Sequence, residues 1–144
     1  MTPPPDPASQ AWVQMRSLVL DDDRRREVAE ALGLSFFRVK ALRRLKDGPF
    51  TLRELAGALL TDAPYTTVVV ADLAERGLVE RVAHPTDRRA KLVRLTSTGA
   101  AAARRAELIL DRPPTALSSL PPEDLAALQR ILAPLARGAG LATD

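Results

Sequence analysis

The sequence contains no cysteine and only one histidine among its 144 residues. Disulfides, thiolate metal ligands and cysteine redox chemistry are therefore excluded, and His84 alone leaves little for histidine-based metal binding or acid–base catalysis. No apolar run approaches the roughly 18 residues of a membrane span. The opening MTPPPDPAS also lacks the cationic start and apolar stretch of a secretory signal. These absences predict a cytoplasmic protein with no membrane segment.

Catalytic residue combinations are missing as well. The chain has no recognisable nucleophile–base pair, no paired carboxylates suited to a cleft and no Gly-rich phosphate loop. Three consecutive acids at 21–23 imitate a metal site, but consecutive carboxylates on a helix point in different directions. The chain is therefore predicted not to be an enzyme, and to bind no metal and no cofactor.

The sequence is rich in arginine, and the cations are unevenly placed. The net charge is only +3, because 18 Arg and 3 Lys stand beside 18 acids. Between residues 81 and 105 there are seven cations and one acid, which gives this segment a charge of +6 and leaves −3 for the rest. Such a segment indicates an anionic partner, with an ordinary solvated surface as the alternative.

Apolar spacing predicts that the chain is mostly helical. A first helix covers residues 9–32, and the charged run DDDRRRE at 21–27 kinks or splits it. Gly33 suits its C-terminal end. A second helix covers 35–46, where apolar residues recur every three positions with cations between them. Ser35 can cap its start.

Two further helices are predicted in the middle of the chain. Thr51 and Glu54 fit a capping box at the start of a short third helix. A fourth helix follows Pro64 and ends at Gly77. Its β-branched residues 66–70 leave a strand as the alternative, but the apolar spacing favours a helix.

After Gly77 the spacing of apolar residues changes from the helical period to the alternation that is typical of strands. The segments 78–83 and 91–95 are short and roughly alternating, and the turn residues between them predict an antiparallel hairpin. Caps in Thr96–Thr98 start a helix that runs to Leu110. A proline-rich break then leads to a last helix at 123–137.

This order of elements predicts a winged helix-turn-helix fold, mainly α with a small antiparallel β-hairpin. The third and fourth helices form the helix-turn-helix, and the hairpin is the wing. We expect a single domain over 1–144, with a DNA-binding region at 35–99. The helices at 8–33 and 100–138 are expected to form a dimerisation region, because their apolar stripes exceed what a small core can cover.

The wing also carries a family signature. The stretch DRRAKLVRLTSTG meets the pattern D-x-R-x5-L-T-x2-G of the MarR family of transcriptional regulators, at Asp87, Arg89, Leu95, Thr96 and Gly99. The chain resembles that family from about residue 31 to 105. The resemblance implies a homodimer that binds a palindromic operator in double-stranded DNA, usually as a repressor that a small effector releases. Aromatic effectors in this family lie near the helix that carries Phe36 and Phe37.

The resemblance also assigns roles in the wing. An arginine at a hairpin tip is narrow and cationic enough to enter the minor groove, where the potential is negative. An aspartate two residues earlier can hold its guanidinium by a paired hydrogen bond. The resemblance gives these roles to Arg89 and Asp87, with Arg88 and Lys91 contacting phosphates. An ordinary turn ion pair between Asp87 and Arg89 is the alternative.

The fourth helix departs from the common family pattern, which often has Arg or Lys near the position of Val68. Its N-terminal half instead offers Tyr65, Thr66 and Thr67, which can donate to phosphates or touch a thymine methyl. Tyr65 as partly buried packing is the alternative. A winged-helix protein-interaction module without a DNA role remains the second function class.

Overall fold

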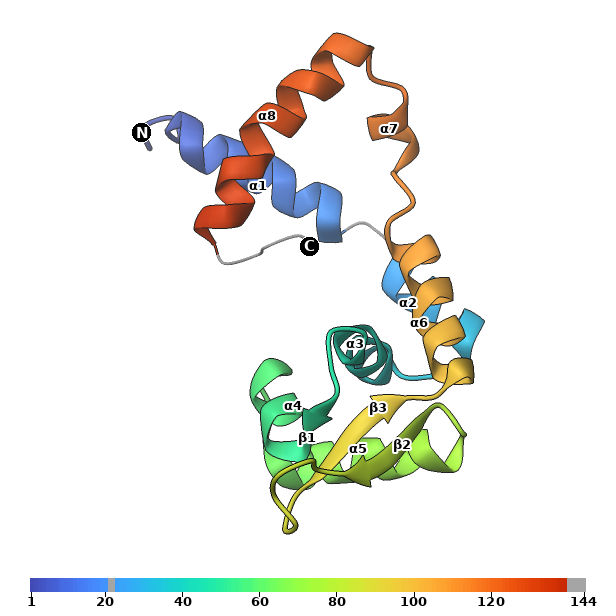
Figure 1. The fold of residues 1–144 in the computed structure, drawn as a ribbon. Coiled ribbons are helices and arrows are strands. Elements are labelled where there is room, and N and C mark those ends of the chain that lie inside the picture. Colours follow the sequence, from blue (N-terminus) through green and yellow to red (C-terminus); the bar gives the residue numbers. More distant parts are fainter. Residues whose placement is uncertain (21–22, 140–144) are drawn as a thin grey trace. The chain divides into compact units, whose positions relative to one another are not determined.

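The computed structural model describes residues 1–20 and 23–139. They form two compact units, divided after Asp111. The first unit contains α1 (Pro7–Leu20), α2 (Arg24–Leu32), α3 (Phe36–Leu45), β1 (Phe50–Thr51), α4 (Leu52–Ala58), α5 (Ala63–Glu75), β2 (Val79–Ala83), β3 (Lys91–Leu95) and α6 (Ser97–Leu110) (Figure 1). The second unit contains α7 (Thr115–Ser118) and α8 (Pro122–Gly138).

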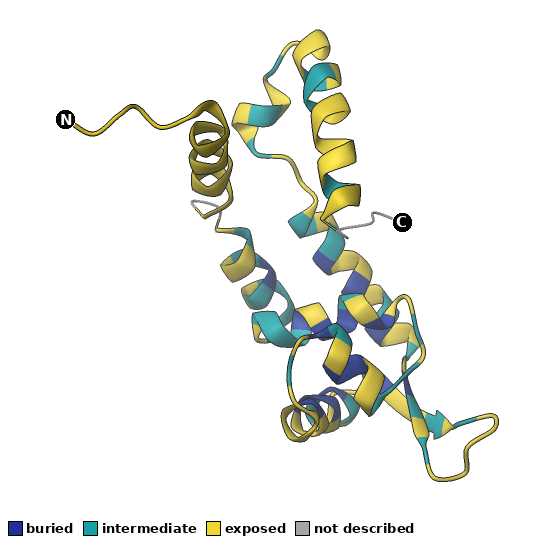
Figure 2. Ribbon diagram, turned by 90° about the vertical axis from the view of Figure 1, so that its left-hand side faces the viewer, coloured by how far each residue is buried: buried dark blue, intermediate teal, exposed yellow. Residues whose placement is uncertain are grey.

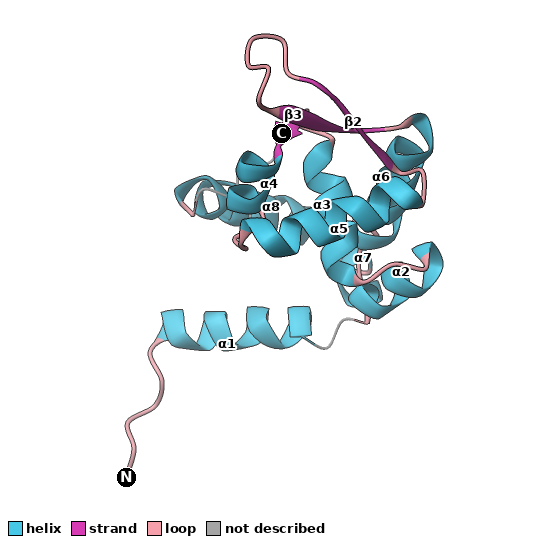
Figure 3. Cartoon of the chain, turned by 90° about the horizontal axis from the view of Figure 1, so that it is seen from below, coloured by secondary structure: helices cyan, strands magenta, loops and turns pink. Residues whose placement is uncertain are grey.

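The predicted hairpin is present and belongs to a three-stranded antiparallel sheet of order β1-β3-β2. Strands β2 and β3 pair from Val79 opposite Leu95 to Ala83 opposite Lys91. Their connecting loop projects from the sheet (Figure 3). The third strand, β1, was not expected; it pairs with β3 and so fixes the start of α4 beside the wing.

The core lies where α2, α3, α4, α5 and α6 pack with the sheet. Its fully buried side chains are mostly Leu and Val, namely Val28, Val39, Leu42, Leu55, Val69, Val70, Leu73 and Val93. In α5 the buried positions keep helical spacing, and the Asp62 carboxylate caps the helix by accepting from the Tyr65 amide at 2.7 Å. The helix prediction for this β-branched segment is therefore confirmed, and the mainly α winged-helix fold with it.

Three predicted helix caps are present. Ser35 Oγ accepts from the Arg38 amide at 3.3 Å, Thr51 Oγ1 from the Glu54 amide at 3.1 Å, and Thr96 Oγ1 from the Gly99 amide at 3.0 Å. Each such cap stabilises its helix by about 1 kcal/mol. Together they set where α3, α4 and α6 begin, and hence the direction in which each helix leaves the sheet.

The junction between the wing and α6 is tightly packed. The Thr96 amide donates to the Leu78 carbonyl at 3.1 Å, and Thr96 Oγ1 donates to the Gly77 carbonyl at 2.6 Å. A Cβ added to Gly99 would lie 1.8 Å from the Leu78 carbonyl oxygen. Glycine is therefore required at this position, where two segments of backbone approach each other.

The terminal helices differ from this core. Neither α1 nor α8 has a buried residue, and the helix that follows the N-terminal segment in Figure 2 is coloured as exposed throughout. The predicted first helix is split, since α1 ends at Leu20 and α2 begins at Arg24. Two residues of the charged run at 21–27, Asp21 and Asp22, lie outside the described residues. No helix in the described ranges is both long enough and apolar enough to cross a membrane.

Candidate nucleic-acid interface

Helices α4 and α5 form the helix-turn-helix. They contact each other, and α5 also contacts β2 of the wing. The turn between them passes through Leu60, whose φ of 54° lies in the left-handed region that favours glycine, and whose side chain is exposed. The two helices and the wing thus form one continuous surface on the first unit.

Helix α5 has a buried side and an outer side. Thr66, Val69, Val70 and Leu73 face the core. Pro64, Thr67, Val68, Ala71 and Glu75 are exposed and follow one another at helical spacing of three and four residues. The outer side is therefore mostly apolar.

The expectation that Thr66 is exposed is wrong. Its side chain is fully buried, and its hydroxyl donates to the Asp62 carbonyl at 2.8 Å. Position 66 falls on the same side of the helix as Val69 and Val70, so it faces the core. The Thr67 hydroxyl is exposed, but its one proton goes to the Ala63 carbonyl at 2.9 Å and is not free for a phosphate.

Tyr65 is partly packed and partly exposed. Its side chain is 41% exposed, and its ring packs against Phe37 of α3 with 4.9 Å between centroids and 52° between planes. The packed ring fixes the direction of the side chain. The phenol hydroxyl is therefore the best-placed hydrogen-bond donor on the N-terminal half of α5.

The wing tip is organised differently from the prediction. The Asp87 carboxylate accepts from the backbone amide of Arg89 at 2.9 Å. No ion pair in the described part of the chain joins it to the Arg89 guanidinium. The expectation of a paired side-chain hydrogen bond is therefore wrong for this structure. Asp87 shapes the loop that carries Arg89, and the guanidinium itself stays exposed.

His84 has a role in this loop that the sequence did not reveal. Its Nδ1 atom accepts from the backbone amides of Thr86 and Asp87 at 3.2 and 3.0 Å. The His84 ring thus holds the first half of the loop in place.

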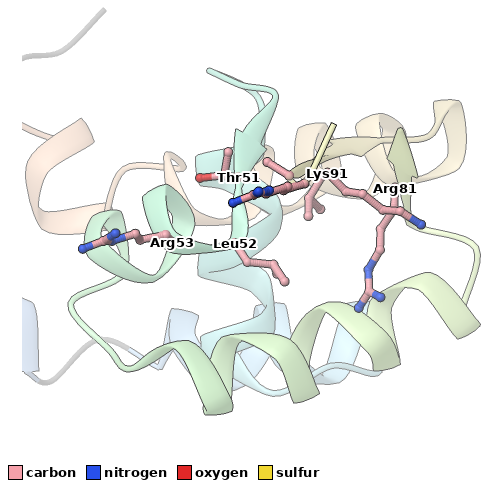
Figure 4. A pocket seen from close by; sticks show the side chains of 8 residues that line it. Thr51, Leu52, Arg53, Arg81 and Lys91 are labelled. Carbon is pink, nitrogen blue, oxygen red and sulfur yellow. The ribbon is translucent and has the colours of Figure 1, made fainter. Parts of the chain in front are cut away.

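An open pocket of about 400 Å³ lies between the start of α4 and the wing. Thr51, Leu52 and Val93 contribute to its wall, and four cations line it, namely Arg53, Arg81, Arg89 and Lys91 (Figure 4). Within the described part of the chain none of the four forms an ion pair. Four unneutralised cations around one pocket produce a strongly positive potential that favours a polyanion.

The structure divides the cationic segment into two kinds of residue. Arg94 pairs with Glu80 on the neighbouring strand at 2.7 Å, so its charge is largely balanced. Arg81, Arg89 and Lys91 line the pocket, and Arg88 is exposed at the wing tip. Arg53 joins them from a distant part of the sequence, because β1 pairs with β3. Sequence reasoning missed Arg53, and it counted Arg81 only as part of the total charge.

The fold and this surface define a winged helix-turn-helix protein. Residues 32–90 match the model of the MarR family. The resemblance to that family is thereby confirmed over these residues.

Several solved structures share this fold. RV1404 from Mycobacterium tuberculosis has 23% identity and a TM-score of 0.77, covering 100% of this chain and 99% of its own. A MarR family protein from Bacillus stearothermophilus has 22% identity and a TM-score of 0.80, covering 92% and 95%. A MepR mutant from S. aureus, bound to an oligodeoxyribonucleotide, has 20% identity and a TM-score of 0.65, covering 91% and 97%. None of the curated proteins compared with the chain matches it.

Proposed function

We propose that the chain is a homodimeric transcriptional regulator that binds a palindromic operator in double-stranded DNA and represses until a small effector releases it. The observation that carries the proposal is the group of four unpaired cations around the pocket beside the helix-turn-helix. The MarR-family region and the oligodeoxyribonucleotide in the MepR structure support the choice of DNA as the polyanion. Such a regulator acts in the cytoplasm, where its DNA target lies, and has no enzymatic activity.

Each part of the surface has a role in this proposal. Helix α5 enters the major groove, and the wing loop places Arg89 in the minor groove, where the potential attracts a guanidinium. Arg53, Arg81 and Lys91, together with Arg88 at the wing tip, contact phosphates on either side. Asp87 acts by ordering the loop, since its carboxylate holds the Arg89 amide. Tyr65 donates its hydroxyl from α5.

Two protomers are needed to read a palindrome, and the terminal helices supply the surface for the second one. Trp12, Leu18 and Val19 of α1 are each more than half exposed, as are Ile131 and Leu135 of α8. Apolar surface of this extent is costly in water and is typical of an interface. Half-sites one DNA turn apart then match the two-fold axis of the dimer. Sedimentation at micromolar concentration should give twice the mass of the chain, and a monomer would contradict the dimer.

The effector part of the proposal relies on the contact between Phe37 and Tyr65. Phe36 and Phe37 are partly buried beside the core. A small aromatic molecule that binds near them, as the family resemblance implies, would move Phe37 and with it the Tyr65 ring at the start of α5. Release of DNA then follows if the ligand binds the displaced arrangement more tightly than the DNA-bound one.

DNA binding is tested by selecting duplexes from a randomised library and titrating the best one at several salt concentrations. If four cations per protomer contact phosphates, a dimer releases counterions from eight sites, and log K should fall with log salt at a slope of about −7. The double variant Arg53→Gln with Arg81→Gln should bring the slope close to about −4. A single Arg44→Gln, which removes an exposed cation of α3 outside the pocket, should leave the slope unchanged.

The same experiment can also exclude DNA binding. If no duplex is enriched and affinity for random DNA is absent at low salt, DNA binding is excluded. A winged-helix protein-interaction module then becomes the better description of the chain.

A further inference from the structure

The outer side of α5 lacks the side chains that usually distinguish bases. Between Ala63 and Glu75 there is no Arg, Lys, Asn or Gln. These are the residues that make bidentate contacts to guanine or adenine. A recognition helix that enters the major groove without them must distinguish bases by other contacts.

The two threonine hydroxyls of α5 do not fill this gap. The Thr66 hydroxyl is buried, and the Thr67 proton is committed to the Ala63 carbonyl. What the middle of the helix offers instead is hydrocarbon, since Val68 is 58% exposed and is flanked by the exposed Thr67 and Ala71. An exposed valine at this place contributes nothing to the core.

The charges around this apolar strip indicate which partner it fits. The pocket cations lie between the start of α4 and the wing, and in Figure 4 the Arg81 side chain extends toward the helix α5. An apolar strip on a helix toward which an unpaired cation extends matches a DNA major groove, where phosphates form the rims and thymine presents its C5 methyl group on the floor. A protein partner would have to offer both acids for the cations and apolar groups for the strip.

We propose that Val68, assisted by Thr67 and Ala71, reads the C5 methyl groups of thymines in the operator. The inference rests on the proposed function, because it requires α5 in the major groove. Val68 is then a specificity-determining residue, and the operator is selected for thymines at the positions that Val68 covers. Each methyl group that becomes buried against the valine strengthens binding by about fourfold.

The test uses the selected duplex with single thymines replaced by deoxyuridine. This change removes the C5 methyl and leaves every hydrogen-bonding group of the base. The wild-type dimer should bind about fourfold more weakly for each contacted methyl that is removed. Deoxyuridine at the other thymines should have no effect.

The Val68→Ala variant shows whether the valine causes the effect. Alanine favours a helix at this exposed position, so the fold is kept. The variant should bind the thymine duplex more weakly than wild type does and lose most of the deoxyuridine penalty. Val68→Thr, which keeps the branched shape and one methyl, should give an intermediate penalty. Glu75→Gln, one turn beyond Ala71 on the same side, should keep the full penalty.

The outcomes separate the inference from the function on which it rests. A deoxyuridine penalty of equal size in wild type and Val68→Ala overturns the inference, because the methyl would then act through DNA shape. A selected duplex that binds tightly and shows no deoxyuridine penalty also overturns it, while leaving DNA binding intact. Failure to enrich any duplex overturns the DNA-binding function and the inference with it.

Discussion

The winged helix-turn-helix region and the terminal helices use their apolar residues in opposite ways. In the first, Leu42, Leu55 and Leu73 are fully buried. In the second, α1, α7 and α8 have no buried residue, and Trp12 and Leu135 are 61% and 57% exposed. The first region has a complete core within one protomer. The second exposes apolar side chains that the proposed dimer would bury.

Truncation of a core leucine should give the largest effect and should distinguish the two regions. Leu42→Ala removes a fully buried side chain and is expected to lower the free energy of unfolding by about 2–5 kcal/mol. Leu135→Ala, in α8, should lower it by less than about 0.5 kcal/mol per protomer, but should raise the dimer dissociation constant about tenfold. Denaturant titrations and sedimentation of both variants measure these quantities.

The concentration dependence gives the control. The Leu135→Ala effect should shrink as the protein concentration rises, because association stabilises the folded state by mass action. The Leu42→Ala effect should not depend on concentration. If the loss of stability depends on protein concentration in the same way for both variants, the two regions do not differ in how they use their apolar residues.

A second pair of substitutions tests the junction inside the core region. Gly99→Ala places a Cβ 1.8 Å from the Leu78 carbonyl oxygen, so the wing or α6 must move. We expect a loss of about 3 kcal/mol. Gly57→Ala, at an exposed interior position of α4 with no atom within 4 Å, should instead stabilise the protein by up to about 1 kcal/mol. Thermal midpoints of the two variants should move in opposite directions.

The core region is also the part that sequence patterns predicted best. Caps and periodicity are local, so Ser35, Thr51 and Thr96 could be placed correctly from a few neighbouring residues. The strand β1 could not be predicted in this way. Its partner β3 lies about 40 residues away, and a strand of two residues is too short to show an alternating apolar pattern. Arg53 was missed for the same reason, since only that pairing brings it beside the wing.

Within the candidate site, two errors have simple physical causes. Thr66 was expected outside because it is polar, but its phase on α5 puts it beside Val69, and a hydroxyl can be satisfied there by the carbonyl four residues earlier. Asp87 was expected to hold a guanidinium, but a short acidic side chain in a turn more readily accepts a nearby backbone amide. Residue type alone does not decide either question.

Removal of the wing-tip cation tests the surface of the core region while leaving its interior intact. Arg89→Ala should weaken operator binding by about 1–3 kcal/mol per half-site, with an unchanged thermal midpoint because the side chain is exposed. Asp87→Ala should cost less, since the cation remains on a less ordered loop. Lys91→Ala should weaken all duplexes about equally, as expected of a phosphate contact. A thermal midpoint that falls in parallel with affinity in the first two variants would mean that both side chains act by stabilising the fold.

The smallest expected effect is on the pH dependence of stability. It is tested with one aspartate from each region. Hydrogen bonds from Arg38 at 2.7 Å and Arg76 at 2.9 Å hold the pKa of Asp72 below its ordinary value of 3.8. The unfolded chain therefore binds this proton more readily than the folded chain. The stabilisation is complete above about pH 3.8 and is lost as the pH falls through the lower pKa of the folded state.

Asp6 has a lowered pKa as well, because it accepts from the Ser9 hydroxyl and from the Ser9 and Ala8 amides at the start of α1. Asp72 ties α5 to α3, whereas Asp6 holds the end of a helix that buries nothing. At neutral pH Asp72→Asn should therefore lower the thermal midpoint of the core, and Asp6→Asn should leave it unchanged. The difference in thermal midpoint between Asp72→Asn and wild type should become smaller as the pH falls below about 4, because the Asp72 carboxylate of the wild type is then protonated and loses its charge. A midpoint that responds equally to both substitutions would mean that α1 belongs to the same cooperative unit as the core.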